Sequence, residues 1–211
     1  MQRRFAQQRL SVHRVDAIDG RMVVPAKLPA PLVSLEYDST PNAAWDTRVT
    51  PGVHCRLTAG EVDCILSHLS VWEQVLAARL PHAIVLEDDV DLAVGFLSRV
   101  QRLISARPWD VLYLGYLTTR AHPVMRPRAG VARPRYLFGT FGYAISRRGA
   151  ERLLELLPVV GPLDVFLSSK FPELRVRCAV PPLVRCQPRS LESSDIVRSA
   201  HQLAAAGPGQ T

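Results

Sequence analysis

The clearest hydrophobic pattern of the chain lies between residues 58 and 80, where apolar side chains recur with helical spacing. One face of a helix there collects seven mostly apolar residues: Cys64, Ile65, His68, Leu69, Trp72, Val75 and Leu76. Thr58 and Glu61 have the spacing of a capping box, in which each side chain binds the other residue's backbone amide. Because Pro81 cannot continue a helix, the pattern predicts a helix that begins at Thr58 and ends before Pro81.

Short apolar runs of strand length alternate with helical segments elsewhere. Strands are expected at 12–18, 82–86, 110–114, 138–145, 174–180 and 183–186, and helices at 93–106, 147–157 and 162–169, with the end of another at 5–10. Residues 21–57 contain five prolines and are expected to be mostly irregular. This alternation is typical of an α/β sandwich with a largely parallel sheet. We expect a single domain over residues 1–198 and a disordered tail over 199–211.

A cluster of carboxylates follows the apolar strand expected at 82–86. The four acids are Glu87, Asp88, Asp89 and Asp91. Adjacent carboxylates repel one another and lose solvation when buried, so a cation would stabilise them. Mg²⁺ and Mn²⁺ prefer such oxygen ligands, and ligands bind at the carboxyl ends of strands in open α/β sheets. The segment therefore indicates a metal-assisted site for a phosphate-bearing substrate, although a solvated acidic turn explains the residues equally well.

The positive charge of the chain is concentrated in one segment. Residues 111–150 contain no Asp or Glu but seven arginines, which account for the whole formal charge of +7: Arg120, Arg126, Arg128, Arg133, Arg135, Arg147 and Arg148. Such a segment would attract a diphosphate or an acidic lipid head group. A solvated arginine-rich loop is the alternative. A nucleic acid is not expected, because no aromatic residues are interleaved at base-stacking spacing.

Composition narrows the class of protein further. With 211 residues and 47% hydrophobic residues, the chain is expected to form one sizeable globular domain. No apolar run approaches the roughly 18 residues that would span a bilayer. The first ten residues have no apolar secretion signal, so a cytoplasmic location is expected. None of the four cysteines forms a C-x-x-C pair, so the sequence does not support a zinc site, and buried reduced thiols are expected.

Six short motifs stand out along the chain: Arg14–Gly20, Leu57–His68, Ile84–Val90, Gly139–Ser146 with Gly149–Ala150, Pro162–Asp164 and Ser194–Ile196. In this order they resemble the motifs of glycosyltransferase family 25, and the resemblance covers about residues 1–197. This family contains bacterial lipopolysaccharide and lipooligosaccharide transferases and is related to collagen galactosyltransferases. One departure is that family members usually begin with an apolar strand, which is missing ahead of Arg3 and Arg4.

The resemblance implies a GT-A-like nucleotide-binding fold, a UDP-sugar donor and a divalent metal ion, Mn²⁺ or Mg²⁺. It implies that Asp89 and Glu87 bind the metal and that Glu87 also contacts the donor. The metal would stabilise the leaving UDP. Asp164 is the expected general base near the acceptor hydroxyl, with Asp88 as a second catalytic residue. For Asp164, the alternative is a negative charge that only stabilises the start of a helix. The remaining expected substrate contacts come from Glu61, Ser67, His68, Gly142 and Tyr143. For His68, the alternative is a hydrogen-bonded core histidine.

The resemblance further implies transfer of a hexose, galactose from UDP-galactose, to a cell-envelope glycan or glycolipid such as lipopolysaccharide. The alternative is a truncated, inactive member that binds a glycan or a partner protein. A phosphotransferase is disfavoured because the sequence has no glycine-rich phosphate loop of the Walker type. A lipid-linked acceptor would bring the segment Arg120–Arg135 to the anionic inner face of the cytoplasmic membrane.

Overall fold

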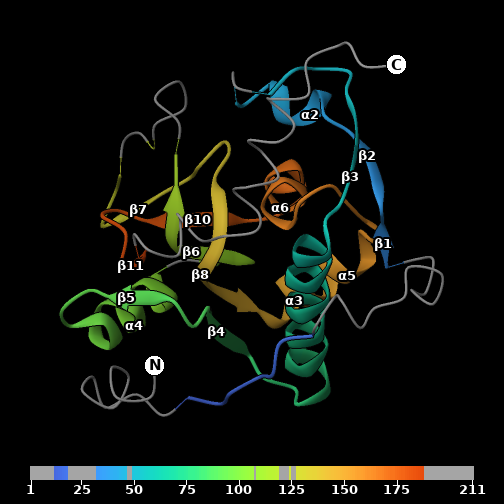
Figure 1. The fold of residues 1–211 in the computed structure, drawn as a ribbon. Coiled ribbons are helices and arrows are strands. Elements are labelled where there is room, and N and C mark those ends of the chain that lie inside the picture. The colour runs from blue at the N-terminus through green and yellow to red at the C-terminus, as the bar shows by residue number, and fades with distance from the viewer. Residues whose placement is uncertain are drawn as a thin grey trace, which may run out of the picture.

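The computed structural model describes residues 12–18, 32–46, 49–106, 108–118, 124 and 127–187 (Figure 1). Its centre is a five-stranded sheet in the order β4-β8-β6-β10-β7. These strands are β4 (His82–Leu86), β6 (Val111–Leu117), β7 (Val131–Ala132), β8 (Phe138–Ser146) and β10 (Val176–Ala179). β8 runs antiparallel to both β4 and β6, whereas β10 runs parallel to β6 and antiparallel to β7. Three strands, β4, β6 and β10, therefore point in one direction.

The predicted α/β architecture of GT-A-like type is confirmed, but neighbouring strands are mostly antiparallel. Only the β6–β10 pair is parallel within this sheet, because β8 inserts between β4 and β6 with the opposite direction. β4 pairs with β8 on one side and has no strand partner on its other side within the described ranges. Strand–helix alternation along the chain cannot reveal such an insertion, because β8 lies far from β4 in the sequence.

The long helix α3 (Ala59–Ala77) confirms the strongest sequence prediction. Thr58 is its N-cap, and both hydrogen bonds of the capping box with Glu61 are present. Its inner face buries Ile65, Leu69 and Trp72 against the sheet. Capping and periodicity act within a few residues, so they determine this helix from local sequence.

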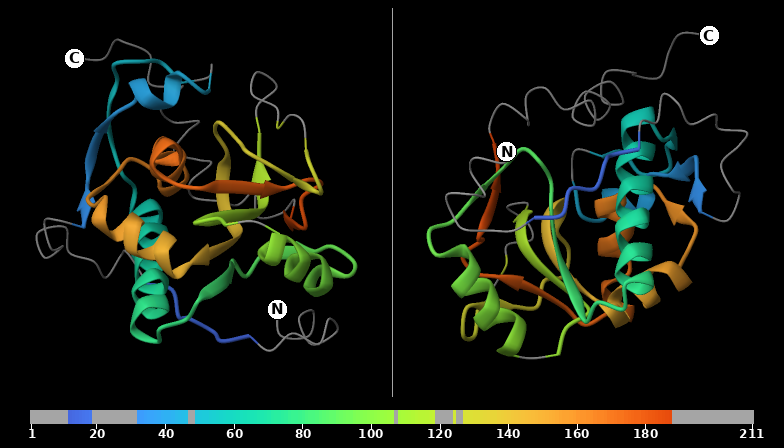
Figure 2. Two further views of the ribbon diagram at one scale, coloured as in Figure 1. Left: turned by 180° about the vertical axis from the view of Figure 1, so that it is seen from behind. Right: turned by 90° about the horizontal axis from the view of Figure 1, so that it is seen from below.

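Helices cover both faces of the sheet, which gives two hydrophobic clusters. α3, α5 (Arg147–Glu155) and α6 (Leu163–Ser169) pack on the face that carries Val111 and Tyr113. α4 (Phe96–Ala106) packs on the face that carries Leu112 and Leu114. Figure 2 shows α3 and α4 on opposite sides of the strands. Because side chains alternate across a strand, a nearly continuous apolar sequence such as that of β6 fills both clusters.

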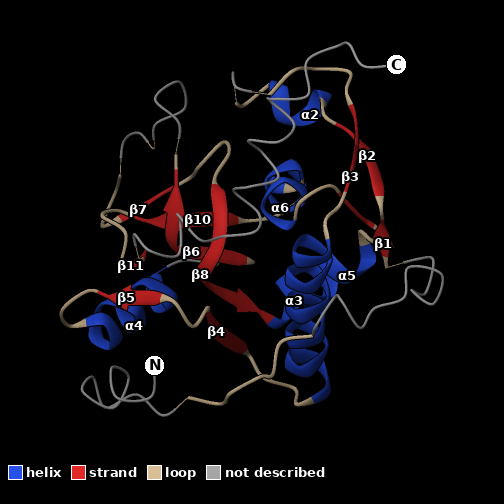
Figure 3. Cartoon of the chain, in the orientation of Figure 1, coloured by secondary structure: helices blue, strands red, loops and turns tan. Residues whose placement is uncertain are grey.

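Shorter elements complete the fold (Figure 3). They are β1 (Val33–Ser34), β2 (Glu36–Asp38), α2 (Thr40–Ala43), β3 (His54–Arg56), β5 (Val90–Leu92), β9 (Val159–Val160), η2 (Phe171–Glu173) and β11 (Val184–Cys186). β1 pairs with β9, β2 with β3, and β5 with β11. The chain between β1 and β3 is thus more regular than its prolines suggest.

Several sequence predictions need correction or fall outside the described ranges. The strand expected at 12–18 is wrong, because this segment forms neither helix nor strand. The helix expected from residue 93 begins at Phe96, and the helix expected to reach residue 157 ends at Glu155. The helix end at 5–10, the domain boundary at 198 and the tail lie outside the described residues. Among the helices that the structure describes, none has the length and apolarity needed to cross a bilayer.

Candidate active site

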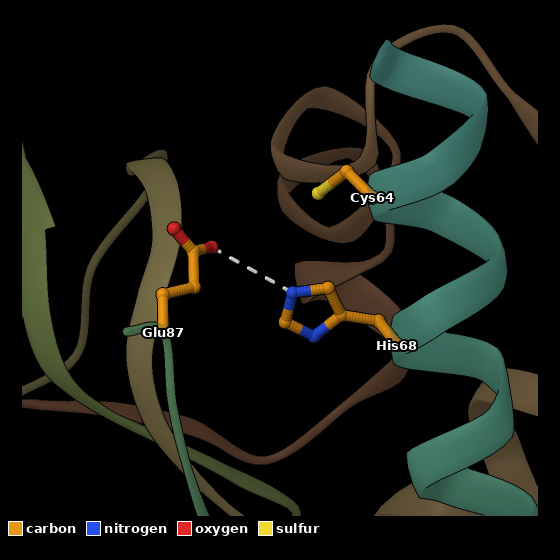
Figure 4. A group of neighbouring side chains, drawn as sticks. All are labelled: Cys64, His68 and Glu87. Atoms are coloured by element: carbon orange, nitrogen blue, oxygen red, sulfur yellow. Dashed lines mark ion pairs between the residues drawn. The ribbon is translucent and has the colours of Figure 1, made fainter. Parts of the chain in front are cut away.

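The candidate site lies where the N-terminal half of α3 faces the end of β4. Cys64 and His68 are one helical turn apart and project from α3 toward Glu87, the residue that follows β4 (Figure 4). Val85 packs on the α3 side of the sheet, and Glu87, the first residue after β4, still faces that side. The amide of Glu87 donates to the Phe141 carbonyl (3.1 Å), which fixes its backbone against β8.

A chain of buried hydrogen bonds orients His68. Nε1 of Trp72 donates to the Tyr143 hydroxyl (2.9 Å), and that hydroxyl lies 2.8 Å from Nδ1 of His68. The other ring nitrogen, Nε2, lies 3.7 Å from Oε1 of Glu87. His68 therefore combines both alternatives left open by the sequence: it is a hydrogen-bonded core histidine, and it also faces the acidic end of β4.

The Glu87 carboxylate is held on two sides but still reaches solvent. Its Oε1 atom accepts a hydrogen bond from the Thr140 hydroxyl of β8 (3.0 Å). The side chain of Glu87 is 36% exposed. Burial, together with the negative charge of Glu87, raises the pKa of the Cys64 thiol to about 12. The ligand atoms of Cys64, His68 and Glu87 all lie within 4.8 Å of one another, so this group could hold a metal ion.

Sequence reasoning missed two contributors to this site, Cys64 as a possible ligand and Thr140 as a hydrogen-bond donor. The periodicity of the sequence places Cys64 on the apolar face of α3 and gives it no further role. The signal available was its spacing of four residues from His68, which puts both side chains on one helix face. Thr140 has no comparable signal, because its contact with Glu87 spans 53 residues of sequence.

Asp88 and Asp89 lie in a turn between β4 and β5. The expectation that Glu87 and Asp89 face the same side assumes an extended chain, and this assumption fails because residues 88 and 89 form a turn. Asp88 is exposed. Oδ2 of Asp89 lies 3.8 Å from the Cys186 thiol, whereas the buried Oδ1 has no hydrogen-bond partner within the described residues. Asp89 is not part of the group formed by Cys64, His68 and Glu87, and its role as a metal ligand stays a prediction.

Asp164, the predicted general base, sits in the first turn of α6. Its two carboxylate oxygens accept from the amides of Gly139 (2.9 Å) and Val165 (2.8 Å). Burial is the main cause that raises its pKa above the ordinary value, and the charge of Glu87 adds to it, against the lowering effect of these hydrogen bonds. The structure thus brings Asp164 and Glu87, which are far apart in sequence, into one electrostatic environment.

Among the other predicted substrate contacts, Glu61 and Ser67 accept hydrogen bonds from backbone amides, and Gly142 packs against β11. The Glu61 carboxylate accepts from the Thr58 amide (2.7 Å) within the capping box, and burial, with a smaller contribution from the charge of Asp164, raises its pKa. The Ser67 hydroxyl accepts from the Ile18 amide (3.0 Å). Gly142 lies against β11, where an added Cβ would come within 2.8 Å of Val184.

Tyr143 is buried, whereas the described arginines of the segment Arg120–Arg135 are exposed. Tyr143 is 1% exposed, so in this structure it acts on the site through His68. Of the arginine segment, Arg128, Arg133 and Arg135 are exposed. Arg120 and Arg126 lie outside the described residues, so a contact with an anion stays a prediction.

Comparison with known proteins gives one consistent family. The profile of glycosyltransferase family 25 (LPS biosynthesis protein) matches residues 1–167. The inactive glycosyltransferase 25 family member 3 of Mus musculus is 33% identical over 171 residues, which cover 77% of this chain and 27% of that protein. The probable inactive member 3 of Bos taurus is 32% identical over 166 residues, covering 74% and 26% of the two chains.

Relatives whose names are those of enzymes match as well. Procollagen galactosyltransferase 2 of Mus musculus is 29% identical over 189 residues, which cover 81% of this chain and 28% of that protein. The chain therefore spans about a quarter of the length of the curated relatives it matches. The profile match extends from the N-terminal region through α3, the acidic turn, β8 and Asp164, and on this evidence the chain belongs to glycosyltransferase family 25.

Proposed function

We propose that this chain transfers a hexose, galactose from UDP-galactose, to a glycan or glycolipid acceptor of the cell envelope such as lipopolysaccharide. The observation that carries the proposal is that two carboxylates bind neighbouring residues of β8. Glu87, beside His68 at the carboxyl end of β4, accepts from Thr140, and Asp164 accepts from Gly139. Procollagen galactosyltransferases among the relatives support galactose as the sugar.

Each of these residues has a place in such a transfer. Thr140 and His68 hold the partly exposed Glu87 carboxylate toward the donor. A partly buried carboxyl whose pKa is raised, such as that of Asp164, is a better proton acceptor for an acceptor hydroxyl than an ordinary carboxylate. Asp88, exposed in the adjacent turn, is a further catalytic candidate on the solvent side.

The residues present fit a divalent metal such as Mn²⁺ or Mg²⁺. Oδ1 of Asp89 is a buried carboxylate oxygen with no hydrogen-bond partner in the described part of the chain, and such an oxygen is stabilised by a cation. Asp89 would hold the ion. That Glu87 shares it stays a prediction, because Glu87 faces His68 whereas Asp89 lies beside Cys186. A bound ion would stabilise the negative charge that develops on the leaving UDP.

An inactive, binding-only protein is the second candidate function. It is favoured by two relatives of 32–33% identity whose names call them inactive or probably inactive. Such a protein would bind a glycan or a partner protein without transferring a sugar.

The experiment measures UDP release from several UDP-sugars with Mn²⁺ or Mg²⁺, alongside the melting temperature with each ligand pair. The proposal expects metal-dependent release that Asp89→Asn reduces at least tenfold. Glu73→Gln, which removes one exposed carboxylate from the outer side of α3, is the matched control and keeps wild-type activity. Stabilisation by metal and UDP-sugar without release would support the binding-only function. Full activity of Asp89→Asn would contradict the assignment of the metal.

We further propose that the protein works at the cytoplasmic face of the membrane, where the segment Arg120–Arg135 meets anionic lipid. The exposure of Arg128, Arg133 and Arg135 supports this contact. Each basic residue near an anionic surface contributes about 1 kcal/mol. The test is salt-sensitive binding to vesicles that contain phosphatidylglycerol. Changing the three arginines to Ser should abolish the binding, and unchanged binding would refute the contact.

A further inference from the structure

We propose that Cys64, His68 and Glu87 form a binding site for a zinc-class transition-metal ion, distinct from the oxygen-ligand site proposed at Asp89. A thiol, an imidazole and a carboxylate converge from two elements, and their ligand atoms lie within 4.8 Å of one another. Figure 4 shows all three side chains pointing into the same space between α3 and the end of β4.

The spacing is close to that of a tetrahedral zinc site. Bond lengths of zinc to sulfur, nitrogen and oxygen place neighbouring ligand atoms about 3.5 Å apart in such a site. Nε2 of His68 and Oε1 of Glu87 are already 3.7 Å apart. Because every separation in the group is at most 4.8 Å, closing the site takes side-chain movements of about 1 Å, with no change in α3 or β4.

Partners outside the group already orient two of its ligands. The Tyr143 hydroxyl lies against Nδ1 of His68 (2.8 Å), which directs Nε2 toward Glu87. The Thr140 hydroxyl donates to the Glu87 carboxylate (3.0 Å). Metal-binding histidines and carboxylates usually have such outer partners, which fix their orientation.

The type of ligand selects the ion. Thiolate and imidazole favour Zn²⁺ and Co²⁺, whereas Mg²⁺ and Mn²⁺ favour sites built from oxygen alone. His68 is 8% exposed in its side chain and Glu87 is 36% exposed, so the ion reaches the group from the side of Glu87. Three protein ligands leave one tetrahedral position for water or another ligand. On binding, the thiol proton of Cys64 is released to solvent and the thiolate sulfur bonds to the metal.

The site shares Glu87 with the proposed donor site, so zinc occupancy would withdraw this carboxylate from the donor. That regulatory consequence rests on the proposed function. Metal binding itself does not, and it is therefore measured without any sugar nucleotide.

The test is a titration of the reduced, metal-free protein with Co²⁺, followed by absorption spectroscopy. We expect one equivalent of Co²⁺ to give tetrahedral d–d bands and a thiolate-to-cobalt charge-transfer band, both abolished by Zn²⁺. Cys64→Ser should remove the charge-transfer band. His68→Gln and Glu87→Gln should each weaken binding at least tenfold. Circular dichroism of each variant establishes that it is folded.

The matched control is Cys186→Ser, which removes the thiol beside Asp89 and outside the group. It should leave the charge-transfer band unchanged. Absence of the band in the wild-type protein would overturn the proposal. So would a band that persists in Cys64→Ser and disappears in Cys186→Ser, because the thiolate ligand would then be Cys186.

Discussion

The buried hydroxyl of Tyr143 supports a sharp prediction about stability. It accepts a hydrogen bond from Nε1 of Trp72 and contacts Nδ1 of His68, and all three side chains are buried, with exposed fractions of 1%, 0% and 6%. Tyr143→Phe removes this oxygen and keeps the ring. Nε1 of Trp72 and Nδ1 of His68 then lack their hydrogen-bond partner at buried positions.

The magnitude follows from the two groups left unpaired. A buried donor or acceptor that loses its partner costs about 1–3 kcal/mol. Trp72 is fully buried and cannot turn its N–H to solvent, so we assign it about 2 kcal/mol, and about 1 kcal/mol to His68, which is slightly exposed. The sum is a loss of about 3 kcal/mol, or about 6–12 °C in melting temperature for a chain of this size.

Tyr113→Phe provides the matched control. Tyr113 lies opposite Tyr143 in the β6–β8 register and is 0% exposed, but its hydroxyl has no hydrogen-bond partner among the described residues. Its removal should change stability by less than about 0.5 kcal/mol or raise it. Urea unfolding with equal m-values gives both differences. Equal losses in the two variants, or a loss below about 1 kcal/mol for Tyr143→Phe, would refute the reasoning.

Three further predictions concern stability. Asp110 is 0% exposed and accepts from Arg148 and Arg175. Burial raises the pKa of Asp110, but the hydrogen bonds outweigh burial and hold this pKa below its ordinary value of 3.8. The ionised carboxylate therefore stabilises the fold above pH 3.8, and this stabilisation is lost as the pH falls through the folded-state pKa. Asp110→Asn should lose about 3 kcal/mol at pH 7 and a smaller further amount on acidification, as acid and urea titrations would show. Thr58→Ala should cost about 1 kcal/mol in urea through the lost cap of α3, while Thr58→Ser stays near wild type. Gly149→Ala should lower the melting temperature by several degrees, about 2 kcal/mol, because its Cβ would collide with the Asp110 carbonyl.

Interactions between residues close in sequence were predictable. The capping box of Thr58 and Glu61, the apolar stripe of α3 and the apolar run of β4 each depend on a few neighbouring residues, and the structure confirms all three. The acidic turn after β4 was also evident. Its side-chain directions were not, because the strand ends at Leu86 and the regular alternation of an extended chain stops there.

The sequence by itself therefore determined the α/β class, the helix α3 and the family motifs, since local periodicity and motif order suffice for these. The tertiary structure alone decided the antiparallel insertion of β8 between β4 and β6. It also decided the placement of Glu87 beside His68 and of Asp164 against Gly139 of β8. The contacts that orient His68 and Glu87 join residues 75 and 53 positions apart. Contacts of such separation form only when α3 and β8 pack against β4, and no pattern within a short stretch of sequence encodes that packing.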